Sequence, residues 1–109
     1  MKKSIQESMN EYVEKNYEKM TEDFHEKFSH SFQEWTRLRN CQAFIIETPN
    51  YIVLKSYNTI VAFIDKMTCQ KFDVLRMVYG YTSTSCQHIN KFFKDYGDYR
   101  VNVYTYRDI

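Results

Sequence analysis

The chain has 109 residues, which suits a single domain that buries about two-thirds of its unfolded surface. Aromatic residues make up 17% of it against two glycines and one proline, so the composition excludes a disordered or linker-rich protein. Fifteen basic and fourteen acidic residues leave a net charge of +1, which excludes a strong overall attraction to nucleic acid or to an anionic membrane.

The sequence also predicts a soluble, cytoplasmic protein. No run reaches the ~20 apolar residues that a membrane span needs, and polar residues follow positions 1–3 where a signal peptide would be apolar. Cys41, Cys69 and Cys86 are widely spaced and lack the pattern of a disulfide framework or a metal site. We expect these cysteines to be reduced and buried as small apolar side chains.

The first third of the chain is predicted to be helical. Its large apolar residues fall three or four positions apart over residues 4–39, which is the period of a helix. Ser4 and Glu7 have the spacing of a capping box at the helix start. Thr21 is suited to cap a second helix, so we expect a bend or a break near residues 20–22.

Charged and aromatic positions of this helix suggest two uses beyond the fold. Acidic residues recur every three or four positions, at Glu7, Glu11, Glu14, Glu18 and Glu22. Such a line of carboxylates could imitate a nucleic-acid backbone in a cationic channel, although the interleaved lysines also fit an ordinary solvated face. An aromatic stripe, suited to cover a sheet or to pair with a second copy, comprises Tyr17, Phe24, Phe28, Phe32 and Trp35.

After residue 40 the pattern changes to short runs rich in β-branched and aromatic residues, at 43–46, 51–54, 60–64 and 72–79. These runs predict strands. Turn residues at 49–50 and 56–59, with a polar connection at 65–70, predict that consecutive strands pair as an antiparallel meander.

One more helix and one more strand are predicted near the C-terminus. Thr84 and Gln87 have capping-box spacing, apolar residues follow at helical intervals, and Gly97 ends the helix. A half-buried strand that closes one side of the sheet is predicted from an alternating set, Tyr99, Val101, Val103 and Thr105.

The predicted fold is therefore a single α+β domain over residues 1–109. Residues 1–40 form an N-terminal helical extension of one long or two helices. Residues 41–109 form an antiparallel sheet of four to five strands with one helix and a final strand. Helices and strands are segregated in sequence, which argues against a parallel βαβ arrangement.

No pattern of residues typical of catalysis or of metal or cofactor binding is present, so we expect no enzymatic activity. His25 and His30 are five positions apart and would project in different directions from a helix. A basic and aromatic sheet face that stacks single-stranded nucleic acid is a further hypothesis. Its residues would be Lys55, Lys71, Arg76, Lys91, Lys94, Arg100 and Arg107 with Tyr79, Tyr81, Tyr104 and Tyr106.

Three segments carry a resemblance: LKSYNTIVA at 54–62, YGYTSTS at 79–85 and HINKF at 88–92. Over residues 50–97 the chain resembles a domain found in small proteins of phages and plasmids of low-GC Gram-positive bacteria. Ser83 stands where that pattern has threonine, and Gln87 where it commonly has a basic residue. In the matched residues we expect Ser56, Asn58 and Thr59 to serve the hairpin turn, and His88 to hydrogen-bond back to it.

The resemblance implies a mobile-element origin and no established enzymatic activity, and in plan the chain is similar to anti-CRISPR proteins. We therefore expect an inhibitor that binds and blocks a CRISPR effector through its N-terminal helical part or an exposed sheet face. The alternatives are a nucleic-acid-binding regulator and a structural homodimer; no membrane partner is expected. The expected partner-binding residues are Glu7, Glu11, Glu14, Glu18, Glu22, Tyr57, Asn58, Arg76, His88, Arg100 and Tyr104.

Overall fold

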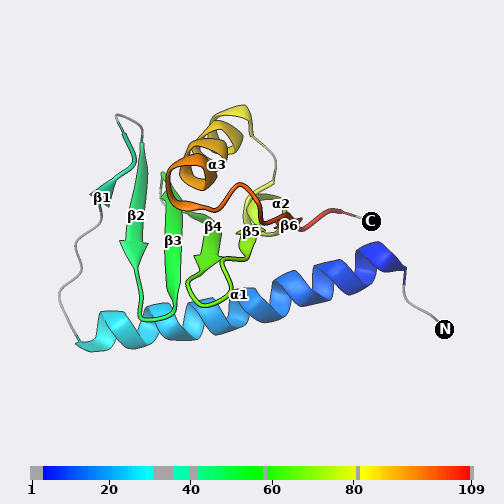
Figure 1. The fold of residues 1–109 in the computed structure, drawn as a ribbon, viewed down its shortest axis with the longest axis horizontal. Helices are drawn as coiled ribbons and strands as arrows, with labels where there is room; N and C mark the ends of the chain where they lie inside the picture. Colours follow the sequence, from blue (N-terminus) through cyan, green and yellow to red (C-terminus); the bar gives the residue numbers. More distant parts are fainter. Residues whose placement is uncertain (1–3, 31–35, 40–41, 58, 81, 109) are drawn as a thin grey trace.

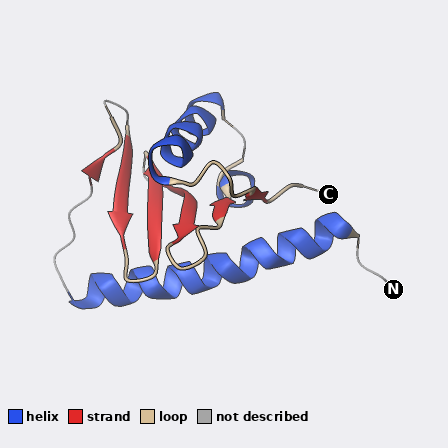
Figure 2. Cartoon of the chain, viewed as in Figure 1, coloured by secondary structure: helices blue, strands red, loops and turns tan. Residues whose placement is uncertain are grey.

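The computed structural model describes residues 4–30, 36–39, 42–57, 59–80 and 82–108, apart from the side chains of residues 26–30. A six-stranded sheet, in the order β1-β2-β3-β4-β5-β6, lies between a long N-terminal helix and a shorter helix of the second half (Figure 1 and Figure 2). The predicted α+β class is confirmed, with more strands than the four to five expected.

Helix α1 (Ile5–His30) is unbroken. Its start is as predicted, because Ser4 Oγ accepts a hydrogen bond from the Glu7 N–H at 3.1 Å. The expected bend at Thr21 is wrong: this hydroxyl donates to the Tyr17 carbonyl at 2.8 Å and caps nothing. At about 1.5 Å per residue α1 is about 39 Å long, and it runs along the longest of the molecule's 47 × 30 × 27 Å extents (Figure 1).

The prediction of helix up to residue 39 is wrong at residues 36–39, and residues 31–35 lie outside the described part of the chain. Strand β1 (Thr36–Arg37) pairs antiparallel with β2 (Ala43–Glu47) at one edge of the sheet. Leu38 then donates its N–H to the Ala43 carbonyl at 2.7 Å and is buried in the core. A single buried residue fits a helical period and a strand period equally well. Three members of the aromatic stripe lie outside the described side chains: Phe28, Phe32 and Trp35.

Four consecutive strands pair antiparallel, which confirms the predicted meander: β2, β3 (Tyr51–Ser56), β4 (Thr59–Asp65) and β5 (Lys71–Asp73). The strand predicted over 72–79 is wrong after Asp73. There the chain forms the four-residue helix α2 (Leu75–Val78), and the Asp73 carboxylate accepts the Leu75 N–H at 3.1 Å.

Helix α3 (Ser83–Tyr96) begins slightly before its predicted start. Thr82 is the N-cap, with its side chain accepting the Ser85 N–H at 3.2 Å, so the expected cap at Thr84 lies inside the helix. Gly97 ends α3 as predicted. A Cβ at this position would lie 2.7 Å from Lys71 Cδ and 2.7 Å from the Phe93 carbonyl oxygen.

Strand β6 (Val103–Thr105) corrects two expectations. It pairs parallel with β5, so the sheet is mixed, and the β5–β6 connection through α2 and α3 is a βαβ crossover. The predicted inner face is also inverted, since Tyr104 and Tyr106 pack into the core while Tyr99 is 92% exposed. Aromatic rings bury more apolar surface than the valine and threonine side chains they displace.

The core consists of two clusters, one on each face of the sheet. Ile89 and Phe92 of α3 pack against one face, and Val13 and Met20 of α1 pack against the other. Neighbouring strand residues divide between the two clusters, as the alternation of a strand requires. The middle strands therefore have a helix on each face, and the exposed sheet face expected as a binding surface is not found among them.

Cysteine burial is a further correction. Cys69 is exposed in the β4–β5 connection, where its φ is 62°, and Cys86 is only half-buried in α3. Cys41 lies outside the described residues. The polar turn around Cys69 is held by the Asp65 carboxylate, which accepts the Met67 N–H at 2.8 Å, and this turn places the thiol outward.

Candidate partner-binding surfaces

The five predicted glutamates lie together on the outer face of α1. Glu7, Glu11, Glu14, Glu18 and Glu22 are all exposed. At about 100° per residue they fall within about 80° of arc around the helix axis, and they span about 22 Å along it. We call this set the acidic line.

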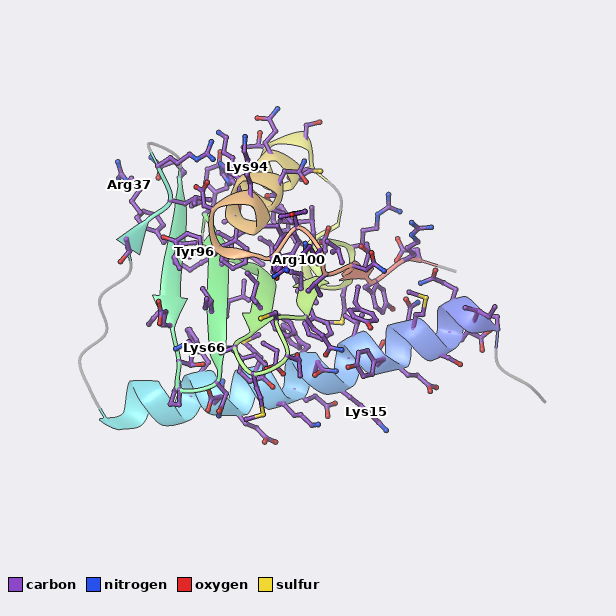
Figure 3. The ribbon with its side chains drawn as sticks, in the orientation of Figure 1. Lys15, Arg37, Lys66, Lys94, Tyr96 and Arg100 are labelled. Atoms are coloured by element: carbon purple, nitrogen blue, oxygen red, sulfur yellow. The ribbon has the colours of Figure 1, made fainter. Side chains whose placement is uncertain are left out.

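The acidic line faces away from the sheet. The buried residues of α1 lie on its other side and include Asn10, Val13, Asn16 and Met20, each at most 7% exposed. Lys15 and Lys19 flank the acidic line on the same outer side, and Figure 3 shows Lys15 pointing away from the sheet. Because the inner side of α1 is packed, the helix holds the acidic line as a rigid array.

The turn between β3 and β4 is tied to α3 by side chains. Ser56 Oγ lies 2.8 Å from His88 Nδ1 and 3.0 Å from Ser85 Oγ, and all three residues are buried. The predicted bond from His88 back to the turn is confirmed. Tyr57, in a left-handed conformation with φ 55°, lays its ring 5.9 Å from the His88 ring.

The His88 ring is an internal group. It is 5% exposed, and burial, followed by the nearby positive charge of Lys91, lowers its pKa. A neutral imidazole can accept a hydrogen bond from the Ser56 hydroxyl at Nδ1. Ser56 Oγ can then accept a hydrogen bond from the Ser85 hydroxyl. Of the residues expected to bind a partner here, Tyr57 is half exposed at the surface, His88 is enclosed, and Asn58 lies outside the described residues.

Apart from Arg76 and Arg107, which line one cavity, the described basic residues of the predicted face do not gather on one surface. Lys71 is 6% exposed, with Nζ 5.8 Å from the centre of the Phe93 ring under α3. Lys55 Nζ lies 5.9 Å from the centre of the Phe44 ring near the other edge of the sheet. Lys94 is on α3, on the side of the molecule opposite α1 (Figure 3). The predicted basic and aromatic face is therefore dispersed.

Arg100 forms a local ion pair. Its guanidinium donates to the Asp98 carboxylate from Nε at 3.1 Å and from Nη2 at 2.9 Å. These bonds, with the one from the Arg100 backbone N–H, lower the pKa of the Asp98 carboxyl to about 2. Tyr104 is used differently, because its ring packs 5.5 Å from Phe72 and 5.2 Å from Tyr12. Arg100 and Tyr104 thus belong to separate parts of the surface.

Two cavities near β6 were not predicted. One of about 310 Å³ is apolar and is lined by Ile5, Ser8, Met9, Tyr12 and Tyr104. Another of about 300 Å³ is lined by Asp73, Leu75, Arg76, Cys86, Thr105 and Arg107. Both depend on the position of β6 between β5 and α1, and no local pattern of residues signals that parallel pairing.

Within the described ranges, no helix is long and apolar enough to cross a membrane. The same part of the chain contains no group of three or more His, Cys, Asp or Glu side chains placed to hold a metal ion.

Among known protein families, the one described as a family of unknown function (DUF8033) matches residues 16–109. The match covers the sheet, both later helices and α1 from Asn16 onward. No curated protein and no solved structure matches the chain.

Proposed function

The chain belongs to the family of unknown function DUF8033, and we propose that it is a non-enzymatic inhibitor of phage or mobile-element origin. In this proposal it binds a CRISPR effector nuclease in the cytoplasm of the host bacterium and blocks it by occlusion. The observation that supports the proposal is the acidic line on the outer face of α1.

The acidic line has the chemistry needed to compete with nucleic acid. Carboxylates three or four residues apart on a helix rise about 4.5–6 Å from one to the next, and a DNA strand carries a phosphate about every 3.4 Å along its axis. A channel lined with arginine and lysine would accept either array. Since α1 is held against the core by Val13 and Met20, little ordering accompanies binding.

The test is capture of a target with tagged protein from a lysate of a CRISPR-carrying, low-GC Gram-positive host. We expect a Cas effector to be recovered, and its recovery to survive nuclease treatment. A variant with Glu14→Gln, Glu18→Gln and Glu22→Gln should recover less of it, whereas Lys15→Gln with Lys19→Gln should recover at least as much. Recovery that depends on intact nucleic acid, or equal recovery by both variants, would contradict the proposal.

A structural homodimer is a second candidate, favoured by apolar exposure at the start of α1. Ile5 is 83% exposed and lines the apolar cavity to which Met9 and Tyr104 also contribute. If the protein dimerises through this surface, sedimentation at micromolar concentration should give twice the mass of the monomer. The Ile5→Asp variant should then sediment as a monomer. A monomeric wild-type protein would remove this candidate.

A further inference from the structure

The parallel pairing of β5 with β6 creates a cleft at one end of the sheet. Asp73 and Thr105 are the last residues of these strands and lie opposite each other in the ladder. From there the chain turns into α2 after β5 and runs toward α1 after β6. The carboxyl ends of neighbouring parallel strands, where the connections diverge, are where open α/β sheets bind ligands.

The walls of this cleft are held by hydrogen bonds. The Asn10 carboxamide of α1 donates to the Arg107 carbonyl at 2.7 Å and accepts the Arg107 N–H at 3.1 Å. The Tyr106 N–H donates to the Asp73 carbonyl at 3.1 Å. Both strand ends are therefore set in place before any ligand arrives, and only the side chains need to adjust.

Two arginines line the cavity from different elements, Arg76 from α2 and Arg107 from the segment after β6. The half-buried Asp73, which carries the opposite charge, and Thr105, which carries a hydroxyl group, also line the cavity. Burial raises the pKa of Asp73, against the opposing effects of the Leu75 N–H and of Arg76. With two arginines against one aspartate, the residues that line the cavity carry a net positive charge and suit an anion.

The arrangement distinguishes between classes of anion. One guanidinium can bind both oxygens of a carboxylate through two parallel hydrogen bonds, so the second of the two arginines adds less to the binding of a carboxylate. A phosphate group has three or more oxygens directed to different sides and can engage both. A carboxyl beside such a group is suited to hydrogen-bond sugar hydroxyls. The volume, about 300 Å³, is near the lower end of the ~300–1,000 Å³ typical of small-ligand sites.

We propose that the cavity at the carboxyl ends of β5 and β6 binds a small phosphorylated ligand of the nucleotide class. Arg76 and Arg107 hold the phosphate, and Asp73 accepts hydrogen bonds from the sugar hydroxyls. The site lies apart from the acidic line of α1, so it stands or falls independently of the proposed inhibitor function.

The experiment is a titration of ¹⁵N-labelled full-length protein with inorganic phosphate, adenosine 5′-monophosphate and adenosine, followed by amide chemical shifts. We expect the monophosphate to shift residues 73–76 and 105–107 with higher affinity than phosphate, and adenosine to shift neither segment. Arg76→Gln or Arg107→Gln should weaken monophosphate binding by about tenfold or more. Arg100→Gln is the matched control, an exposed arginine outside this cavity, and should leave it unchanged.

Three outcomes would overturn the proposal. The first is the absence of chemical-shift changes in the two segments at monophosphate concentrations up to about 10 mM. A dissociation constant above that concentration would be too weak for a specific site. The second is an equal loss of binding in Arg100→Gln, which would indicate a general attraction to positive charge. The third is phosphate binding with no gain from the nucleoside, which would rule out the nucleotide class.

Discussion

At the scale of single residues, the link between Ser56, Ser85 and His88 gives the protein a specific dependence on pH. The folded protein protonates His88 less readily than the unfolded chain does, because burial and Lys91 lower its pKa from 6.5. Between the folded pKa and 6.5, the unfolded chain binds more protons. The free energy of unfolding should therefore fall as the pH falls below 6.5 through that interval.

Replacement His88→Asn tests this dependence, because an asparagine amide can occupy the place of Nδ1 without titrating. Urea unfolding of both proteins between pH 7.5 and 5 should show a decline in the wild type that the variant lacks. Parallel declines in the two proteins would mean that other groups cause the effect and that His88 is not the sensor.

Gly97 is required for a steric reason. An alanine Cβ would meet Lys71 Cδ and the Phe93 carbonyl oxygen, each at 2.7 Å. The lysine stem can move, but the carbonyl belongs to the last turn of α3. Gly97→Ala should lower the free energy of unfolding by about 1–3 kcal/mol, measured by urea denaturation. A midpoint equal to that of the wild type would show that the C-terminal end of α3 relaxes freely.

At the scale of secondary-structure elements, Asn10 joins the first helix to the last strand. It is 5% exposed and makes two hydrogen bonds to the backbone of Arg107, 97 positions away. Asn10→Ala should cost about 1–3 kcal/mol and raise amide hydrogen exchange in β6.

Asn16→Ala is the matched control for this substitution. Asn16 is 7% exposed, but its amide donates to the Tyr12 carbonyl within α1. Exchange in β6 should therefore stay at the wild-type level in Asn16→Ala. Equal exchange in the two variants would mean that β6 is held by β5 alone.

Local pattern was sufficient for the central elements and insufficient for their ends. The short β-branched and aromatic runs of β2 to β4 and the cap at Ser4 are local features, and both were predictable. Thr21 looked like a cap in sequence, but in the continuous helix its hydroxyl bonds back to Tyr17. The run after Phe72 is apolar enough for either a strand or a buried helical turn, and periodicity cannot separate the two over so few residues.

The candidate surfaces were predictable where they depend on one element. The acidic line follows from spacing on a single helix, and the position of His88 follows from its place in the first turns of α3. The cavity lined by Asp73 and Arg107 was not predictable in this way, because these residues are 34 positions apart in the sequence. The parallel pairing of β5 with β6 brings them together. The same pairing dispersed the predicted basic face, since it turned Tyr104 toward Tyr12.

At the scale of the whole molecule, the distribution of charge distinguishes the proposed inhibitor from the alternative function, a nucleic-acid-binding regulator. The net charge is +1, with the acidic line on one side and the cations dispersed over α1 and the other elements. We expect affinity for bare DNA or RNA no tighter than about 10⁻⁴ M at physiological salt, measured by fluorescence anisotropy. Micromolar binding with a steep dependence on salt would instead favour the regulator.

We propose that the outer face of α1 inhibits a CRISPR effector by occlusion. The most direct measurement is target cleavage by the captured effector in the presence of increasing amounts of one of three proteins. These are the wild type, the glutamate variant (Glu14→Gln, Glu18→Gln and Glu22→Gln) and the lysine variant (Lys15→Gln and Lys19→Gln). Three exposed ion pairs contribute about 0.2–1 kcal/mol each, so the glutamate variant should inhibit roughly 3- to 140-fold more weakly. The lysine variant should inhibit at least as well as the wild type. Uninhibited cleavage at saturating wild-type protein, or equal inhibition by all three proteins, would contradict the claim.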